Sequence, residues 1–288
     1  MPAGIIDGKA VAAEIKNELK IRVAELEKSG IECKLSLIIV GNDPASQVYV
    51  ANKEKACAYC GVKSEIIRMG ENSSESEIVA EVEKLARDKS VNGILVQLPL
   101  PKGLDEQKIL SHIPAEKDVD GLTSASVGEL FLGRPCLTAC TPSGVMQLLK
   151  RYGVETKGKN AVVIGRSNMV GKPMAHLLLQ ADCTVTVCHS KTQNLKERTL
   201  TADILVIAAG RKKFITGDMV KPGAVVIDVG INRDENGKLC GDADFDSVSQ
   251  VASLITPVPG GVGPMTVAML LCNTVKAAAM QNGLAYEL

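Results

Sequence analysis

The sequence predicts an α/β protein built from two domains, and three observations support this. Short apolar runs alternate with amphipathic helical stretches along nearly the whole chain, a pattern typical of parallel sheets covered by helices. The length of 288 residues suits two such domains better than one small core. The second half repeats the order strand, helix, strand, helix, strand, which is the architecture of a mononucleotide-binding half of a Rossmann-type domain. We therefore expect an N-terminal α/β domain, a Rossmann-type domain and a cleft between them.

The first domain is expected to cover residues 1–140. Its first helix has apolar residues at helical spacing and ends before Gly30, a residue that commonly follows a helix. The expected elements are a helix over 6–28, a strand over 35–40, a helix over 44–60, a strand over 65–69, a helix over 75–87 and a strand over 93–98.

The second domain is expected to cover residues 141–264, after a turn-rich stretch. Its first helix begins near Thr141 and ends at Gly153. The expected elements after it are strands over 160–164, 184–188, 204–208 and 224–229, with helices over 172–180 and 195–200. A final helix within 265–288 is expected to pack back on the first domain.

The composition argues against several classes of partner. Lysine plus arginine and aspartate plus glutamate number 33 each, whereas a surface that binds nucleic acid or a membrane would favour a basic face. The N-terminus lacks the features of a secretory signal, and no stretch approaches the about 20 apolar residues that span a bilayer. Nine thinly spread cysteines do not indicate a disulfide framework. We expect a cytoplasmic protein.

Two cysteine pairs raise the question of a metal. Cys57 and Cys60 form a C-x-x-C, but they lie in a helical pattern, and Cys136 and Cys140 are separated by a gap unsuited to a zinc site. No histidine falls nearby at ligand spacing. We expect no metal site and interpret these cysteines as small buried apolar residues.

A nucleotide site is indicated by the turn that follows the strand over 160–164. This turn carries Gly165 and Gly171, six positions apart, and Pro173 falls in the first turn of the next helix. Glycine permits a tight turn, and the helix opens with free N–H groups that suit a pyrophosphate. The segment is not a G-x-G-x-x-G, so an ordinary strand-to-helix turn stays open as an alternative.

The end of the second strand favours NADP over NAD. Folds that bind NAD place an acid there, about 20 residues after the glycine turn, to bind the ribose 2′-hydroxyl. Here the strand ends in His189, Ser190, Lys191 and Thr192, with no acid. Hydroxyl groups, a lysine and the upstream Arg166 would favour a 2′-phosphate.

A possible acid–base group lies in the helix over 44–60. Ser46, Tyr49 and Lys53 fall at helical spacing, so they should share one face. A desolvated lysine can become a base, and a nearby phenol can orient a proton. Glu54 and Lys55 follow, so a solvated helix face is the alternative.

Three further features suggest a ligand pocket. Gln97 interrupts an apolar strand near its carboxyl end, where open α/β sheets bind ligands, although a satisfied core amide is the alternative. Asp118 and Asp120 lie in a glycine-ended loop, where they could accept N–H groups of a heterocycle or cap the loop. The glycine- and proline-rich stretch 256–266 would let a ligand touch the backbone.

Together these segments resemble the bifunctional methylenetetrahydrofolate dehydrogenase/methenyltetrahydrofolate cyclohydrolase family. They follow the family's order and span nearly the whole chain. The matching stretches are Ser46-x-x-Tyr49-x-x-x-Lys53, Val96-Gln97-Leu98-Pro99-Leu100-Pro101, Lys117-Asp118-Val119-Asp120-Gly121, Gly165-Arg166-Ser167-x-x-Val170-Gly171-x-Pro173 and Pro259-Gly260-Gly261-Val262-Gly263-Pro264-Met265-Thr266.

The resemblance implies two reactions of one-carbon folate metabolism. NADP would oxidise 5,10-methylenetetrahydrofolate to the methenyl cation, and water would then convert the cation to 10-formyltetrahydrofolate. The implied catalytic residues are Lys53, held by Gln97, with Tyr49 and Asp120 at the pterin. The implied folate contacts are Ser46, Tyr49, Val96, Leu98, Pro99, Asp120, Pro259, Gly260, Gly261 and Val262. The implied NADP contacts are Gly165, Arg166, Ser167, Val170, Gly171, Pro173, His189, Ser190 and Ile231. The family is usually a homodimer, so we expect one here.

Two alternatives use the same residues differently. Another NADP-dependent oxidoreductase, such as a short-chain dehydrogenase, also places tyrosine four residues before lysine, but there the dinucleotide fold comes first in the sequence. A non-catalytic NADP-binding regulator would have no need of an acid–base group such as Lys53.

Overall fold

The chain folds into two compact units, seen in a computed structural model that describes residues 2–286. One unit contains residues 13–140 and the described residues from 267 onward, and we call it the three-stranded unit. The other contains residues up to 12 together with 141–266, and we call it the six-stranded unit. The sequence-based boundary at 140 assigned the first twelve residues to the first domain. The structure groups them with the six-stranded unit, because the short strand β1 (Gly4–Ile5) pairs with β11 (Leu254–Ile255).

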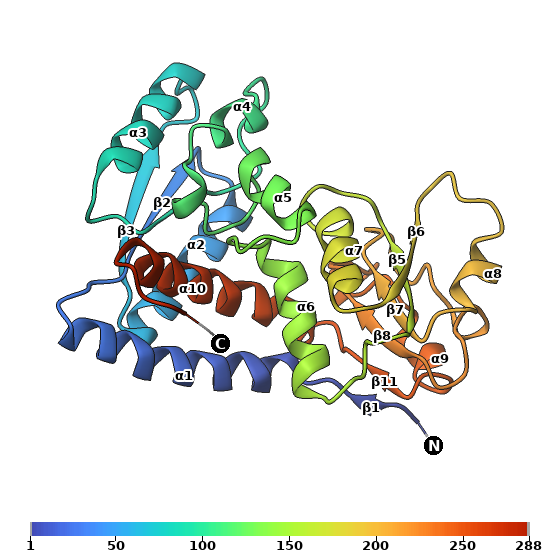
Figure 1. Ribbon diagram of the computed structural model, residues 1–288. Helices are drawn as coiled ribbons and strands as arrows, with labels where there is room; N and C mark the ends of the chain where they lie inside the picture. Colours follow the sequence, from blue (N-terminus) through green and yellow to red (C-terminus); the bar gives the residue numbers. More distant parts are fainter. Residues whose placement is uncertain (1, 287–288) are drawn as a thin grey trace. The chain divides into compact units, whose positions relative to one another are not determined.

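The three-stranded unit is built on a parallel sheet with the order β3-β2-β4, of which β2 and β3 are labelled in Figure 1. Its strands are β2 (Lys34–Val40), β3 (Lys63–Met69) and β4 (Gly93–Val96). Its helices include α2 (Pro44–Cys60), α3 (Glu75–Arg87), α4 (Glu106–Leu110) and α5 (Ser124–Phe131), with the 3-10 turn η1 (Ala115–Lys117). The last strand ends at Val96 instead of the predicted 98, although the backbone N–H of Gln97 still donates to the carbonyl of Ile38 at 2.8 Å. Farther along, prolines at 99 and 101 have no N–H group to extend the ladder.

Local sequence fixes where α2 begins and ends. The side chain of Asp43 accepts a hydrogen bond from the backbone N–H of Ser46 at 2.7 Å, and Pro44 occupies the first turn. Gly61 ends the helix in a left-handed conformation with φ of 80°. This frame sets the rotation of α2 and therefore the direction in which Lys53 projects.

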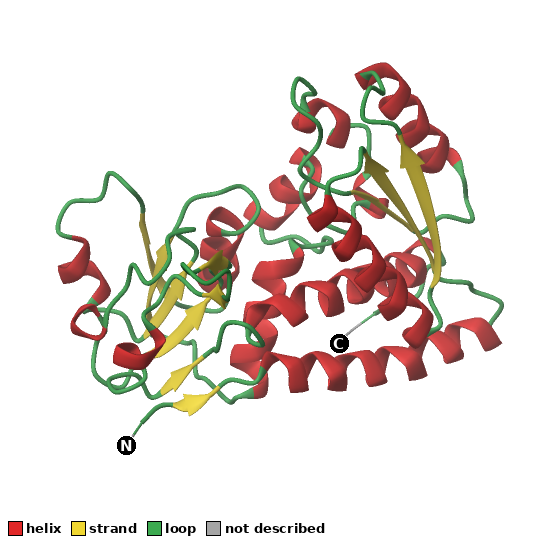
Figure 2. Cartoon of the chain, turned by 180° about the vertical axis from the view of Figure 1, so that it is seen from behind, coloured by secondary structure: helices red, strands yellow, loops and turns green. Residues whose placement is uncertain are grey.

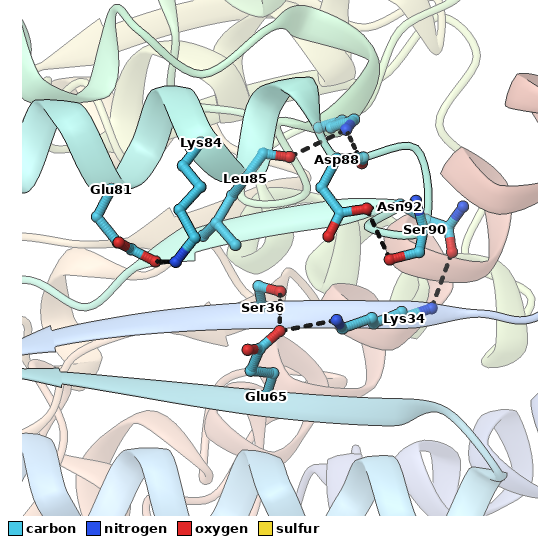
Figure 3. Close-up of polar contacts among 10 residues, drawn as sticks. Lys34, Ser36, Glu65, Glu81, Lys84, Leu85, Asp88, Ser90 and Asn92 are labelled. Carbon is cyan, nitrogen blue, oxygen red and sulfur yellow. Dashed lines mark hydrogen bonds and ion pairs between the residues drawn. The ribbon is translucent and has the colours of Figure 1, made fainter.

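Polar contacts tie the start of β2 to its neighbours (Figure 3). The backbone N–H of Lys34 donates to Oδ1 of Asn92 at 2.8 Å, and Lys34 Nζ lies 2.8 Å from Glu65 Oε2. Asp88 accepts two hydrogen bonds from Ser90 in the loop before β4. The partly exposed ion pair contributes less than about 1 kcal/mol, so the buried amide of Asn92 is the firmer anchor. These contacts hold the register of β2 beside β4, which leads to Gln97.

The six-stranded unit is a parallel sheet with the order β1-β11-β8-β7-β5-β6. Its longer strands are β5 (Asn160–Ile164), β6 (Thr184–Cys188), β7 (Ile204–Ile207) and β8 (Val225–Asp228), of which β6 lies at the edge of the sheet. Its short helices are α7 (Gly171–Gln180), α8 (Leu195–Thr199), α9 (Phe245–Val248) and the 3-10 turn η2 (Gly217–Met219), and β9 (Asn232–Arg233) pairs with β10 (Leu239–Cys240). The strand order reverses at β5, because β6 lies on one side of it and β7 on the other. Such a reversal is where doubly wound sheets bind ligands.

Three helices have residues in both units, and like all helices they are drawn red in Figure 2. They are α1 (Gly8–Lys28), α6 (Cys140–Arg151) and α10 (Val262–Gln281). No apolar stretch of membrane-spanning length was expected from the sequence, but α10 is long and apolar enough to cross a membrane by length and composition alone, with an 18-residue window of mean hydropathy 1.3. Of that window, 72% is buried inside the structure, as in the core helix of a globular protein.

Candidate active site

The structure brings Lys53 and Gln97 together at one end of the three-stranded sheet. Lys53 projects from α2, and its Nζ donates to Oε1 of Gln97 at 2.9 Å. The Gln97 amide is itself oriented, because its Nε2 donates to the backbone carbonyl of Leu98 at 2.7 Å. The amide oxygen therefore faces the lysine, so both alternatives considered for these residues, a solvated lysine and a purely structural core amide, are disfavoured.

The surroundings of Lys53 favour its neutral form. Burial lowers the pKa of Lys53, and the nearby Asp120 carboxylate opposes this only in part. Burial likewise raises the pKa of Asp120, although the Lys53 ammonium favours the charged carboxylate. An amine with a lowered pKa can take a proton from a reacting water, which is the property a general base needs.

Asp118 and its neighbour Asp120 have different roles in the same loop. Asp118 is buried, and its carboxylate accepts from the backbone N–H groups of Gly121, Leu122 and Thr123 at 3.0, 3.3 and 2.8 Å. Loop capping is thus the role of Asp118. Because Asp118 accepts these loop N–H groups, the carboxylate of Asp120 is not needed to cap the loop and lies beside Lys53.

Cys140, interpreted from the sequence as a small buried apolar residue, is a neighbour of this site. Its thiol lies against Asp120, and burial raises its pKa well above the ordinary value, so it stays protonated. Asn273 of α10 holds the surrounding backbone, because its Nδ2 donates to the carbonyls of Val119 and Thr138 at 2.8 Å each. Among residues 2–286 no group of three histidine, cysteine or acidic side chains could hold a metal.

The other folate-site residues are placed less uniformly. Ser46 is buried and Tyr49 is 47% exposed, so the phenol ring is open to a ligand whereas the serine is not. Val96 is only 2% exposed and packs in the core, so its side chain is not available for folate. A strand buried on both faces leaves only backbone groups for such a contact. Leu98 is partly buried and Pro99 is exposed.

The glycine- and proline-rich stretch lies in the six-stranded unit, where it meets the start of α1. The backbone N–H of Lys9 donates to the carbonyl of Gly260 at 3.0 Å, and the N–H of Gly261 donates to the carbonyl of Pro257 at 2.8 Å. A Cβ at Gly8 would lie 1.8 Å from the Gly261 carbonyl oxygen, so only glycine permits this approach. Pro259 is exposed, and Val262 is buried at the start of α10.

A cavity of about 220 Å³ opens at the carboxyl ends of β5 and β6. It is lined by Ile164, Gly165, Arg166, His189, Ser190, Leu195, Ala208, Ala209, Arg211 and Phe214. Four of these were predicted to bind the cofactor, namely Gly165, Arg166, His189 and Ser190. Arg211 and Phe214 were missed, and their position after the third strand of the Rossmann pattern is the signal that could have found them.

The remaining predicted cofactor residues shape the turn or lie outside this cavity. Ser167 Oγ accepts from the backbone N–H groups of Val170 and Gly171 at 3.2 and 3.3 Å and so supports the start of α7. A Cβ at Gly171 would lie 2.2 Å from the carbonyl oxygen of Gly165, which explains the glycine. Pro173 is buried in the first turn of α7, and Ile231 is 54% exposed and does not line the cavity.

Comparison with known sequences decides the family. The sequence model of the tetrahydrofolate dehydrogenase/cyclohydrolase catalytic domain matches residues 6–120, and that of the family's NAD(P)-binding domain matches residues 139–282. The chain belongs to the tetrahydrofolate dehydrogenase/cyclohydrolase family. The Lys53 site falls within the first match or beside it, and the cavity falls within the second.

Members of this family resemble the chain over almost its full length. The bifunctional protein FolD of Agathobacter rectalis is 57% identical over 96% of this chain and 99% of its own. FolD of Acetivibrio thermocellus is 56% identical over 98% of this chain and 99% of its own. The crystal structure of FolD from Campylobacter jejuni superposes with a TM-score of 0.95 at 52% identity, covering 98% of this chain and 100% of that one. The Trypanosoma brucei dehydrogenase–cyclohydrolase, solved with NADP and an inhibitor, has a TM-score of 0.91 at 42% identity over 96% of this chain and 98% of its own.

Proposed function

We propose that this chain oxidises 5,10-methylenetetrahydrofolate with NADP and hydrolyses the resulting 5,10-methenyltetrahydrofolate to 10-formyltetrahydrofolate. The observation that carries the proposal is the Lys53–Gln97 hydrogen bond of 2.9 Å beside Asp120, in a chain that belongs to the dehydrogenase/cyclohydrolase family. Family membership gives the substrate class, and the site supplies the base that the second reaction needs.

The cavity of the six-stranded unit suits NADP. Its lining contains two arginines, a serine and a histidine but no carboxylate, so it can accept the 2′-phosphate without repulsion. When bound, NADP supplies the hydride acceptor. The chain's own contribution to this step is to hold the nicotinamide and the folate at contact distance, because hydride transfer needs no base at carbon.

The hydrolysis is assigned to Lys53. Water adds to the methenyl carbon, and the neutral amine of Lys53 accepts a proton from that water as the new carbon–oxygen bond forms. That proton then moves to N5 as the carbon–N5 bond breaks, the remaining hydroxyl proton is released to solvent as its oxygen becomes the formyl carbonyl, and the formyl group stays on N10. Gln97 keeps the amine in place through its oriented amide oxygen. Asp120 is placed to accept N–H groups of the pterin, and Tyr49 offers an exposed ring for stacking.

We also propose that the protein is a cytoplasmic homodimer that binds neither nucleic acid nor membranes. All nine cysteines are free, as is usual in a reducing compartment. Equal numbers of acidic and basic residues give no excess of positive charge for phosphate-rich partners. Sedimentation equilibrium of the purified chain tests the dimer, and a single monomeric species would contradict it.

A two-substrate absorbance assay tests the proposed function. The purified chain is given 5,10-methylenetetrahydrofolate with NADP or with NAD, and NADPH or NADH is recorded over time. In a second cuvette, loss of 5,10-methenyltetrahydrofolate is followed without nucleotide. We expect NADPH formation well above NADH formation and hydrolysis above the uncatalysed rate. An NADP-dependent oxidoreductase of another kind would reduce NADP with a different oxidisable substrate, such as an alcohol, and leave methenyltetrahydrofolate intact.

A further inference from the structure

The cavity at the carboxyl ends of β5 and β6 is lined by a positively charged side chain, that of Arg211, to which neither the sequence nor the family comparison gave a role. Arg211 lines this cavity together with Arg166 and Ser190. Arg211 comes from the loop that follows β7, whereas Arg166 follows β5 and Ser190 follows β6. The sheet order places β5 between the other two strands, so three separate loops contribute to one cavity.

The backbone of the Arg211 loop is fixed by a buried carboxylate. Asp242 is fully buried and accepts from the backbone N–H groups of Ala209, Gly210 and Arg211 at 2.6, 2.9 and 2.8 Å. Its Oδ1 also accepts from Nδ2 of Asn232 at 2.8 Å. Hydrogen bonds to a charged acceptor are among the stronger ones in proteins, so this loop is set before any ligand arrives.

The guanidinium group of Arg211 is also held in place, by the aromatic ring of Phe214 and not by an acidic side chain. Its Cζ lies 4.1 Å from the centroid of Phe214, a cation–π distance. Phe214 is partly buried and packs against the core of the six-stranded unit. Within residues 2–286 the ion pairs of the structure engage Lys212 and Lys213 with acids, but none engages the Arg211 side chain. Its charge is therefore positioned and not neutralised.

The position in the fold indicates which part of NADP this charge meets. In dinucleotide folds the pyrophosphate binds at the glycine turn and the N-terminus of the helix that follows it, which here is the turn before α7. The end of β6 is where dinucleotide folds bind the adenosine ribose at its 2′ position. Ser190 stands at that point and shares the cavity with both arginines. A phosphate there would face two guanidinium groups, from the loops that follow the adjacent strands β5 and β7.

We propose that Arg211 is a specificity-determining residue that binds the 2′-phosphate of NADP as a second cation beside Arg166. The inference rests on the proposed use of NADP. A guanidinium can offer paired N–H donors to phosphate oxygens, and Phe214 and Asp242 hold the residue so that little conformational entropy is lost on binding.

Fluorescence titration of the full chain with NADPH and with NADH tests the proposal. Removing a hydrogen bond to a charged group costs about 1.5–3 kcal/mol, so Arg211→Gln should raise the Kd for NADPH about 10- to 100-fold. The Kd for NADH should change less than about twofold, because NADH has no 2′-phosphate. Arg211→Lys, which keeps the charge but not the paired donors, should fall between wild type and Arg211→Gln.

Lys212→Gln is the matched control, because Lys212 is the adjacent cation but pairs with Glu235. It should leave both dissociation constants unchanged. If Arg211→Gln weakened the binding of NADPH and NADH equally, the proposal would be overturned, because Arg211 would then support the loop or stack on the cofactor without selecting for the 2′-phosphate. It would also be overturned if Arg211→Gln left the dissociation constants for both NADPH and NADH unchanged. A wild-type chain that binds NADH as tightly as NADPH would overturn the use of NADP itself, and this inference with it.

Discussion

Replacing Lys53 with methionine separates the two reactions most cleanly. Methionine keeps most of the side chain's length and removes the amine that donates to Gln97 at 2.9 Å. General acid–base catalysis contributes about 10²- to 10⁴-fold, which corresponds to about 3–5 kcal/mol at 1.36 kcal/mol for each factor of ten. We therefore expect the cyclohydrolase kcat to fall about 1,000-fold, near the middle of that range.

The same change should have little effect on stability and nucleotide binding. Burial already disfavours the Lys53 ammonium, so its removal relieves a desolvation cost. The Gln97 oxygen loses its donor, but Gln97 is only partly buried and can bond to water. The free energy of unfolding should change by less than about 2 kcal/mol, which is the net of these opposing effects. The Kd for NADPH should stay the same.

The assay follows the loss of methenyltetrahydrofolate absorbance, with the uncatalysed rate subtracted, beside urea unfolding and NADPH titration. Lys55→Met is the matched control, because Lys55 is exposed on the same helix and should leave all three measurements unchanged. Hydrolysis by Lys53→Met at the parental rate would refute the reasoning. If Lys53→Met lost both NADPH binding and hydrolysis, the variant would be damaged as a whole and would not show the loss of a base alone.

Three further variants test separate parts of the site. Gln97→Ala removes the acceptor that holds Lys53 and should reduce cyclohydrolase kcat about tenfold, the effect of about one neutral hydrogen bond. Burial lowers the pKa of Lys53, so the wild-type rate should rise with pH as the amine loses its proton, with a midpoint below the ordinary 10.5, and Lys53→Met should lose that rise. Ser190→Asp places a carboxylate in the cavity and should lower kcat/KM for NADP at least about tenfold, while kcat/KM for NAD stays the same. One unfavourable charge contact of about 1.4 kcal/mol would produce this factor. An unchanged preference for NADP over NAD would count against the cofactor assignment. Gly171→Ala puts a Cβ 2.2 Å from a backbone oxygen and should weaken NADPH binding. Gly128→Ala is the control and should not weaken it, because a Cβ there meets open space in α5. If the two variants bound NADPH equally well in a titration, the turn would not be the binding element.

The sequence predicted the longer strands well and drew attention to Lys53 and Gln97, which the structure places in contact. Gln97 was found because a polar residue interrupts an apolar strand, and Lys53 was found by its helical spacing. The cofactor turn was found because glycines follow a strand and precede a helix. In each case the signal lies within a few residues, and the parallel sheet then brings the ends of the strands together.

The missed features depend on contacts between distant segments. Arg211 lies in the polar run Arg211-Lys212-Lys213, which looks like any exposed loop until β7 is placed beside β5. Asp242 supports that loop from more than thirty residues away in sequence. The strand β1 has only two residues, too few for a periodic pattern, so the grouping of the first twelve residues could not be predicted.

One measurement tests the central claim that a single chain carries both reactions with separate machinery. The wild type and Lys53→Met are each incubated with 5,10-methylenetetrahydrofolate and NADP, and NADPH, the methenyl intermediate and 10-formyltetrahydrofolate are quantified together over time. The wild type should form NADPH and the 10-formyl product, and the variant should still form NADPH while the methenyl intermediate accumulates. Absence of NADPH from the wild type, or 10-formyl product from Lys53→Met at the wild-type rate, would contradict the account.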